Sequence, residues 1–279
     1  MKIGIFDSGI GGLSLLHKAM SIIPEVDYVF YADVDHVPYG ERKSEEIYTF
    51  VDEAVGFLVN KGCEAIVLAC NTATSVAITP LRNKYKIPVV GIEPAVKPAV
   101  MHCNGKRVMV VATPVTAKGA KLKNLIMRYD TENLVDVIAL PKLVRFAQND
   151  IFTGNDVMNY LNNSFAGYNP VDYSQLVLGC THFNYFKDSF AKIFKDADII
   201  DGNEGVSNNL RNILIKNGVD LDSERKKHML ALSEREMSDK EQPKAPINVE
   251  YYYSGRKVGE EETEHIKLLH KRLEEMQRI

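Results

Sequence analysis

Two cysteines occupy matched places in the sequence, and their type and spacing suggest acid/base chemistry. The apolar run Ile66–Ala69 leads directly into Cys70, and the similar run Leu176–Gly179 leads into Cys180, 110 residues further along. A cysteine that ends a strand and precedes a helix lies near backbone N–H dipoles, which lower the pKa of a thiol. One such thiol is typical of a nucleophile, whereas two in equivalent places suggest two bases that face one carbon atom. The alternative for each cysteine is a small buried hydrophobe.

A histidine and an aspartate complete this candidate catalytic group. His182 lies two residues after Cys180, where it could tune that thiol. Asp7 follows the first apolar run of the chain, at a place where backbone donors attract anions, and this favours a role in handling protons. The alternative for Asp7 and its neighbour Ser8 is that they cap a helix.

Other small polar residues follow the predicted strands. In open α/β sheets, ligands bind outside the carboxyl ends of the strands, so these residues are candidates for substrate binding. Backbone N–H groups at helix starts favour carboxylates or phosphates, which suits a small anionic substrate. The strand-end residues are Asp7, Ser8 and Gly9; Pro38, Tyr39 and Gly40; Cys70, Asn71 and Thr72; Glu93, Pro94 and Ala95; Thr113 and Thr116; and Cys180, Thr181 and His182.

Short β-branched and aromatic runs predict the strands that carry these residues. Several are apolar on both faces and alternate with helical patterns, which is typical of βαβ units with parallel sheets covered by helices. A weak internal repeat relates Lys2–Ser8 to Arg107–Thr113, in addition to the two cysteine segments, and predicts two related halves that face each other across a cleft. The predicted strands are Lys2–Phe6, Tyr28–Ala32, Ala65–Ala69, Val89–Gly91, Arg107–Ala112, Asp136–Ala139, Leu176–Leu178, Asp198–Ile200 and Val249–Tyr253.

The C-terminal part of the chain predicts a return to the first half. The densely charged segment Asp222–Pro246 indicates a solvated surface helix or connector. One further strand follows it, and helical spacing of apolar residues then predicts a final amphipathic helix. We therefore expect one domain from residues 1–98 together with about 210–279, and a second from residues 99–209. The apolar residues of the final helix are Ile266, Leu269, Leu273 and Met276.

Composition excludes several classes of protein. The chain has 279 residues, of which 45% are hydrophobic and 25% charged, and its net charge of −3 gives no field for binding nucleic acid or anionic lipid. No run approaches the roughly 18–20 apolar residues of a membrane span, and the first apolar run stops at Asp7, too soon for a signal peptide. We expect a cytoplasmic protein.

Cofactor motifs are also missing from the sequence. Without CxxC or HExxH spacing no metal site is expected, and Gly9–Ser14 does not match the dinucleotide-binding pattern GxGxxG.

Five segments, taken in order, resemble the signature segments of the glutamate racemases in the aspartate/glutamate racemase superfamily. They are FDSGIGGLS, DHVPYG, LACNTAT, GIEPAVKPA and LGCTHF, and the match runs from Met1 to about Asn209. The resemblance implies two pseudo-symmetric, doubly wound α/β domains with mainly parallel sheets and an active site in the cleft between them. It also implies racemisation without a cofactor or a metal, with Cys70 and Cys180 as opposed acid/base groups.

The resemblance also implies roles for individual residues. In the family, the residues that match Asp7 and His182 assist the thiols. The thiol that matches Cys70 acts on the D-enantiomer, and the one that matches Cys180 acts on the L-enantiomer. A role in supplying D-glutamate for peptidoglycan and a homodimeric assembly follow from the same resemblance. The substrate-binding positions expected here are Asp7, Ser8, Pro38, Tyr39, Gly40, Asn71, Thr72, Thr113, Thr116, Thr181 and His182.

Two departures and three rival interpretations accompany this resemblance. In the first departure, Leu140 and Gln148 stand where the family commonly carries a cysteine and an acidic residue, so no assisting carboxylate is expected there. In the second, the charged segment Asp222–Pro246 is longer than the family needs. The nearest rival is an aspartate racemase or another racemase of the same superfamily, such as a hydantoin racemase. A two-lobed binding protein would leave both thiols without a role, and a Cys–His hydrolase would leave one thiol without a role.

Overall fold

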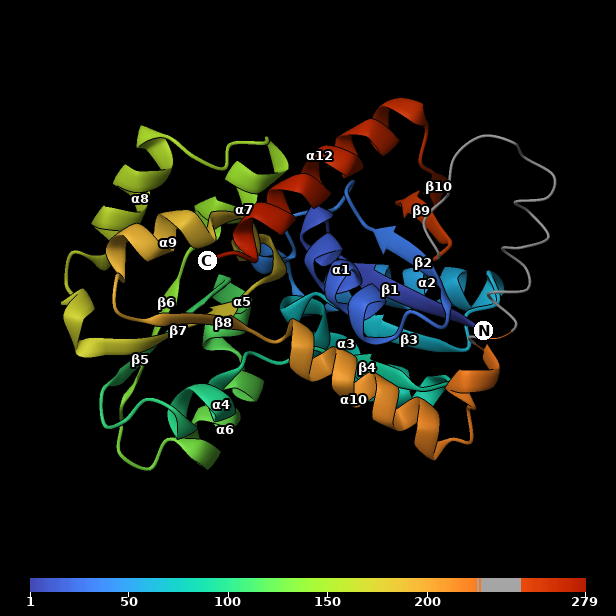
Figure 1. Ribbon diagram of the computed structural model, residues 1–279, viewed down its shortest axis with the longest axis horizontal. Helices are drawn as coiled ribbons and strands as arrows, with labels where there is room; N and C mark the ends of the chain where they lie inside the picture. The colour runs from blue at the N-terminus through green and yellow to red at the C-terminus, as the bar shows by residue number, and fades with distance from the viewer. Residues whose placement is uncertain (225, 227–246) are drawn as a thin grey trace.

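The computed structural model describes residues 1–224, 226 and 247–279 and builds them around two sheets (Figure 1). The first sheet has the strand order β10-β9-β2-β1-β3-β4, and the second has the order β6-β5-β7-β8. Every pairing is parallel except that of β9 with the short β10. Mainly parallel sheets with helices on both faces confirm the predicted fold class.

The first sheet joins the N-terminal and C-terminal parts of the chain. The C-terminal strand β9 lies parallel to β2, with Tyr28 opposite Val249 and Ala32 opposite Tyr253. The strand β9 therefore extends the sheet of the first half. The strands are β1 (Lys2–Asp7), β2 (Asp27–Ala32), β3 (Ala65–Leu68), β4 (Val89–Gly91), β9 (Val249–Tyr253) and β10 (Arg256–Lys257).

Alternating side chains fill the two faces of this sheet. On β2, Tyr28 and Phe30 point into the core beneath α1, whereas Val29 and Tyr31 point into the core beneath α2 and α3. Both faces are apolar because helices cover both. The covering elements are η1 (Ile10–Gly12), α1 (Leu13–Ile22), η2 (Tyr39–Glu41), α2 (Ser44–Asn60), α3 (Asn71–Lys84), α10 (Asn203–Lys216) and α12 (Glu260–Met276).

The second sheet is buried in the same way. Val108 and Val110 pack toward α4 and α6, whereas Met109 and Val111 pack toward α7, α8 and α9. Its strands are β5 (Arg107–Ala112), β6 (Val135–Ala139), β7 (Tyr173–Gly179) and β8 (Asp198–Asp201). Its helical elements are α4 (Val96–Met101), α5 (Pro114–Lys118), α6 (Ala120–Tyr129), α7 (Pro141–Gln148), α8 (Asn155–Phe165), η3 (Pro170–Asp172), η4 (Thr181–Phe186) and α9 (Lys187–Ile193).

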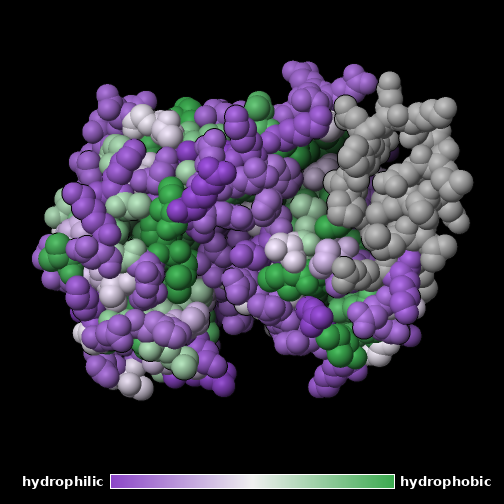
Figure 2. All heavy atoms as spheres, in the orientation of Figure 1, coloured by the Kyte–Doolittle hydropathy of each residue, from purple (hydrophilic) through white to green (hydrophobic). Residues whose placement is uncertain are grey.

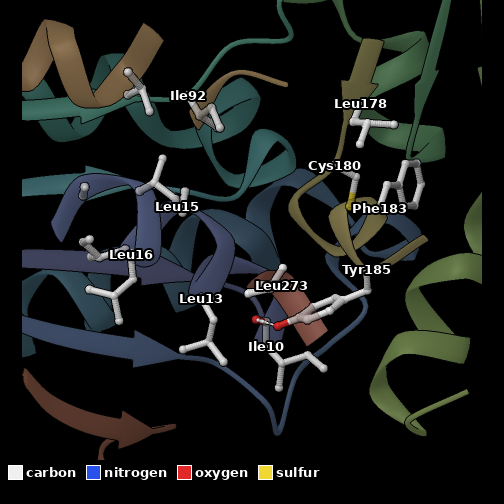
Figure 3. Close-up of a cluster of buried hydrophobic side chains, with 14 of the residues drawn as sticks. Ile10, Leu13, Leu15, Leu16, Ile92, Leu178, Cys180, Phe183, Tyr185 and Leu273 are labelled. Atoms are coloured by element: carbon white, nitrogen blue, oxygen red, sulfur yellow. Dashed lines mark hydrogen bonds between the residues drawn. The ribbon is translucent and has the colours of Figure 1, made fainter. Parts of the chain in front are cut away.

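The C-terminal helix α12 connects the two halves (Figure 1). All four of its predicted apolar residues are buried. Near its end, the Arg272 guanidinium donates to the carbonyl of Tyr185 at 2.9 Å and forms a 2.8 Å ion pair with Asp188. Figure 3 shows Leu13 of α1, Tyr185 of η4 and Leu273 of α12 in one buried cluster. The hydrophobic core is therefore continuous across both halves.

Most predicted strands agree with the structure to within one residue. The main difference is β7, which is four residues longer than predicted because polar residues such as Gln175 are buried within it. The strand β10 was not predicted, since it is only two residues long. Most of Asp222–Pro246 lies outside the described residues, and the domain boundaries stay a prediction. Among the helices that the structure describes, none is long and apolar enough to cross a membrane.

Candidate active site

The two matched cysteines lie at the carboxyl ends of strands in facing sheets. Cys70 follows β3 and caps α3, and its Sγ accepts hydrogen bonds from the Ala73 amide and the Ser8 hydroxyl, both at 3.4 Å. Cys180 links β7 to η4. Each residue is only 6% exposed, and both thiols are free. Their positions agree with the strand-end prediction.

Burial makes both thiols weaker acids than a free cysteine. Desolvation is the largest cause, and it raises the pKa of Cys70 to about 11 and the pKa of Cys180 well above its usual value of 9.0. The negative charge of Asp7 acts in the same direction on both thiols, and Cys70 also raises the pKa of Cys180. The expectation of a lowered thiol pKa is therefore wrong, because desolvation outweighs the nearby N–H donors.

Asp7 is a fully buried carboxyl between the two halves. Its Oδ1 accepts from the Gly9 amide at 2.9 Å, and its Oδ2 accepts from the Thr181 hydroxyl at 2.9 Å. Desolvation raises the pKa of Asp7 from 3.8 to about 7, although both hydrogen bonds act to lower it. Asp7 can therefore gain or lose a proton near neutral pH.

His182 lies beside Cys180 and is 1% exposed. Its Nδ1 is 3.9 Å from Cys180 Sγ, and its Nε2 is 2.7 Å from Nε2 of Gln148. Burial lowers the pKa of His182 to about 3, so the imidazole is neutral at physiological pH. Leu140, the other departure from the family pattern, is buried in the hydrophobic core where α7 begins.

Three threonine hydroxyls form a cluster that joins the two halves. Thr72 Oγ1 lies 2.8 Å from Thr113 Oγ1 and 3.3 Å from Thr116 Oγ1. Gly40 packs directly on this cluster, since a Cβ there would lie 2.7 Å from the Cβ of Thr113. The neighbouring Asn71 is buried, and its Oδ1 has no hydrogen-bond partner among the described residues. These groups are hydrogen-bonding positions for a polar ligand.

The Tyr39 hydroxyl is bonded to a second buried carboxylate. It donates to Oδ2 of Asp33 at 2.5 Å, and the same aspartate accepts from Ser254 at 3.0 Å. Pro38 precedes Tyr39 and is half-buried. Sequence reasoning missed Asp33, although this residue directly follows β2 and the strand-end rule would have found it. The same rule would have found Ser254, which directly follows β9 although it lies 221 residues after Asp33 in the chain.

Close backbone packing holds the two halves together around these groups. A Cβ on Gly11 would lie 2.5 Å from the backbone nitrogen of His182, so only glycine fits between η1 and η4. The Tyr185 hydroxyl donates to the carbonyl of Ile10 at 3.0 Å, and Figure 3 shows this pair beside Cys180 and Phe183. The carboxyl ends of both sheets therefore meet at one buried site.

A large cavity lies elsewhere between the halves. It has a volume of about 880 Å³ and is lined by residues that include Glu93, Pro94, Tyr129 and Asn203, but by neither Cys70 nor Cys180. Figure 2 shows the surface hollowed between the two halves on this side. Glu93, Pro94 and Ala95, which follow β4, line this cavity. Among the described residues, no cluster of three or more histidine, cysteine or acidic side chains could hold a metal ion.

Comparison with known proteins places this geometry in a family. Residues 14–205 match the family model described as Asp/Glu/Hydantoin racemase. The chain belongs to this family. It is therefore a racemase, and the resemblance inferred from its motifs is confirmed.

Individual members of the family are similar over most of the chain. A glutamate racemase from Lachnospira eligens is 62% identical over 283 residues, which cover all of both chains. The crystal structure of Escherichia coli glutamate racemase in complex with L-glutamate has 27% identity and a TM-score of 0.71, and the match covers 76% of this chain and 82% of that one. Francisella tularensis glutamate racemase in complex with D-glutamate has 26% identity and a TM-score of 0.72, covering 90% and 87%.

Proposed function

We propose that this racemase interconverts L- and D-glutamate without a cofactor, using Cys70 and Cys180 on opposite faces of the substrate Cα. The observation that carries the proposal is the pair of free, buried thiols at the carboxyl ends of β3 and β7 in facing sheets. The high identity to a glutamate racemase over the whole chain supports glutamate as the substrate. An aspartate or other amino-acid racemase of the same superfamily remains the alternative.

The reaction moves one proton at each face of Cα. In the L-to-D direction, the Cys180 thiolate takes the α-proton, and the electron pair of the C–H bond delocalises into the substrate carboxylate. The Cys70 thiol then donates its proton to the opposite face. The thiols end in exchanged protonation states and return to their starting states through solvent. Cys180 takes this role by analogy with the family, and the reverse direction begins at Cys70.

Asp7 and His182 adjust the protonation of the thiols in this proposal. Because both thiols have raised pKa values, the thiolate that begins each turnover needs stabilisation. His182 Nδ1 lies beside Cys180, and the charge of Asp7 acts on both thiols. With its pKa near 7, Asp7 is able to exchange protons in the range where the enzyme works.

The polar groups of the site suit an amino acid with two carboxylates. We assign carboxylate binding to the hydroxyls of Ser8 and the threonine cluster, to Thr181, and to backbone N–H groups where α3 and η4 begin. Such fixed donors stabilise the negative charge that develops on the carboxylate when Cα loses its proton. The unpartnered Oδ1 of Asn71 is an acceptor for the substrate ammonium group. The substrate-binding set is Asp7, Ser8, Pro38, Tyr39, Gly40, Asn71, Thr72, Thr113, Thr116, Thr181 and His182.

The wider role follows from the family resemblance. We propose that the enzyme supplies D-glutamate for peptidoglycan, acts in the cytoplasm and forms a homodimer. We also propose the division into residues 1–98 with about 210–279, and 99–209. The pairing of β9 with β2 supports the assignment of the C-terminal segment to the first of these domains.

Circular dichroism of purified protein with L- or D-glutamate tests the function. No metal or pyridoxal phosphate is added. The signal from either enantiomer should decay to zero, because the equilibrium mixture is racemic. L-aspartate is the matched control and should decay far more slowly. Turnover of aspartate with none of glutamate would overturn the proposal and favour the alternative racemase.

A further inference from the structure

Gln148 makes a direct contact with the imidazole of His182. It is the last residue of α7, and its side-chain Nε2 lies 2.7 Å from Nε2 of His182. Gly9, the residue before η1, leaves the space for this contact, since a Cβ there would lie 2.3 Å from Gln148 Nε2 and 2.9 Å from His182 Nε2. Three segments therefore converge on one hydrogen bond at the back of the imidazole.

The donor and acceptor roles in this contact follow from the chemistry of the two groups. In this orientation of the Gln148 side chain the amide nitrogen faces the ring and donates, and Nε2 of His182 accepts. A neutral imidazole has one proton, which must then be on Nδ1. Nδ1 is the atom that lies 3.9 Å from the sulfur of Cys180. Burial lowers the pKa of His182 to about 3, so the ring does not take a second proton at neutral pH.

We propose that Gln148 is a positioning residue that fixes His182 as the neutral Nδ1–H tautomer, which donates toward Cys180. The inference rests on the proposed function, in which Cys180 forms a thiolate. An N–H group directed at the sulfur stabilises that thiolate without adding a charge to the site. A carboxylate at position 148 would have the opposite effect, because it accepts from Nε2–H and favours an imidazolium.

Among the described residues, no charged group forms an ion pair with His182. Asp7, Cys70 and Cys180 are the titratable groups whose strand ends meet at the site, and η1 carries no charged residue. Several charged groups on the helices that pack against η4 have other partners: Arg145 of α7 pairs with Glu41, Arg272 of α12 with Asp188 of α9, Lys187 of α9 with Asp201, and Lys18 of α1 with Glu204; His17 of α1 lies beside His270 of α12. A carboxylate introduced at position 148 would therefore be a new direct ionic partner for the imidazole.

Nuclear magnetic resonance of protein labelled with ¹⁵N-histidine tests the tautomer directly. The His182 signals are assigned by their loss in the His182→Asn variant. In the wild type, the proton should be on Nδ1 and should stay there between pH 5 and 9. In Gln148→Glu, the ring should be doubly protonated over part of this range. A wild-type proton on Nε2 would overturn the proposal.

The kinetics give a second readout. Gln148→Met keeps the length of the side chain and removes the amide, so kcat/KM should fall about tenfold, as expected for one lost hydrogen bond. The fall in kcat/KM must be the same in the L-to-D and D-to-L directions, because the equilibrium constant between the two enantiomers is one. Gln148→Glu should add an ionisation between pH 5 and 9 to the profile of kcat/KM, whereas the wild type has none from His182.

A matched control separates the local contact from general charge. Asn149→Asp adds the same negative charge one residue further along, on the exposed side of the chain, and should leave the pH profile unchanged. If Gln148→Glu and Asn149→Asp gave the same profile, the proposed role of Gln148 would be wrong. A wild type that does not racemise glutamate would refute the proposed function instead, and the tautomer measurement would still decide the role of Gln148.

Discussion

Thr181 donates a 2.9 Å hydrogen bond to the buried carboxyl of Asp7, although 174 residues separate them in the chain. The bond joins the carboxyl end of β1 in one sheet to the start of η4, which follows β7 of the other sheet. Separation of the two halves would break it and expose Asp7 to water, which lowers the pKa of the carboxyl toward 3.8. Closure of the halves is thereby coupled to the protonation of a group beside the reacting thiols.

Asp7→Asn should slow racemisation more than it weakens substrate binding. The amide keeps the size of the carboxyl but cannot exchange a proton with the thiols. We expect kcat to fall by about 10²–10⁴-fold with a smaller change in KM, as for the loss of an acid/base partner. Steady-state kinetics in both directions measure this. A rise in KM with kcat unchanged would instead mean that Asp7 stabilises the bound substrate and the transition state equally.

The same substitution should stabilise the fold at high pH. Because the pKa of Asp7 is raised on folding, the folded protein holds more protons than the unfolded chain between pH 3.8 and about 7, and stability falls as pH rises through this window. The rise in pKa corresponds to about 4 kcal/mol. Asp7→Asn removes this cost, so its advantage in free energy of unfolding should grow from pH 4 to 7 and then level off. Urea denaturation at pH 4, 5.5 and 8 tests this, and an advantage independent of pH would contradict it.

Cys70→Ser and Cys180→Ser should each abolish racemisation while the fold is kept. A hydroxyl is nearly isosteric with a thiol but does not supply the anion that takes the α-proton. Cys63→Ser and Cys103→Ser are the controls, because Cys63 lies beside Gly4 before β3 and the Cys103 thiol donates to the carbonyl of Val100. Turnover per folded molecule should be nearly normal in both controls. Near-normal turnover in Cys70→Ser or Cys180→Ser would mean that this cysteine only packs in the core and is not an acid/base group.

Gly11→Ala should impair catalysis by moving the two halves apart. The new Cβ would lie 2.5 Å from the His182 backbone nitrogen and 2.6 Å from Thr181 Oγ1, and neither position can be relieved by a flexible side chain alone. A displacement near 1 Å at a site of this kind lowers kcat/KM about 10²-fold. Gly205→Ala in α10 is the matched control: no atom lies within 4 Å of its new Cβ, so activity should be unchanged and stability should rise by about 0.5–1 kcal/mol.

The sequence predicted positions along the chain better than it predicted the environment of each side chain. Strand ends could be located because buried parallel strands have recognisable apolar runs, and this rule placed Asp7, Cys70 and Cys180 together. The raised thiol pKa values could not be foreseen, since helix N-termini are visible in a sequence whereas the depth of burial depends on both halves. Gln148 was recognised as a departure from the family, but its contact with His182 depends on how α7 packs against η4.

The two-base arrangement predicts where solvent hydrogen enters the substrate. Starting from L-glutamate in D₂O, the Cys180 thiolate removes the α-proton, and the Cys70 thiol on the opposite face delivers a deuteron already equilibrated with solvent. Early D-glutamate should therefore carry deuterium at Cα, whereas the remaining L-glutamate at low conversion should carry almost none. A single base serving both faces would return much of the original proton. Mass spectrometry of the separated enantiomers measures both.

The Cys70→Ser variant provides the control for this isotope experiment. Without an acid on the D-side, the carbanion can be reprotonated only by Cys180, which returns deuterium only when its thiol exchanges with solvent while the carbanion is still bound. L-glutamate should then acquire deuterium slowly with no D-glutamate formed, and Cys180→Ser should show the mirror result with D-glutamate. Rapid deuterium uptake into unreacted L-glutamate by the wild type, ahead of product formation, would contradict the placement of Cys70 and Cys180 on opposite faces of Cα.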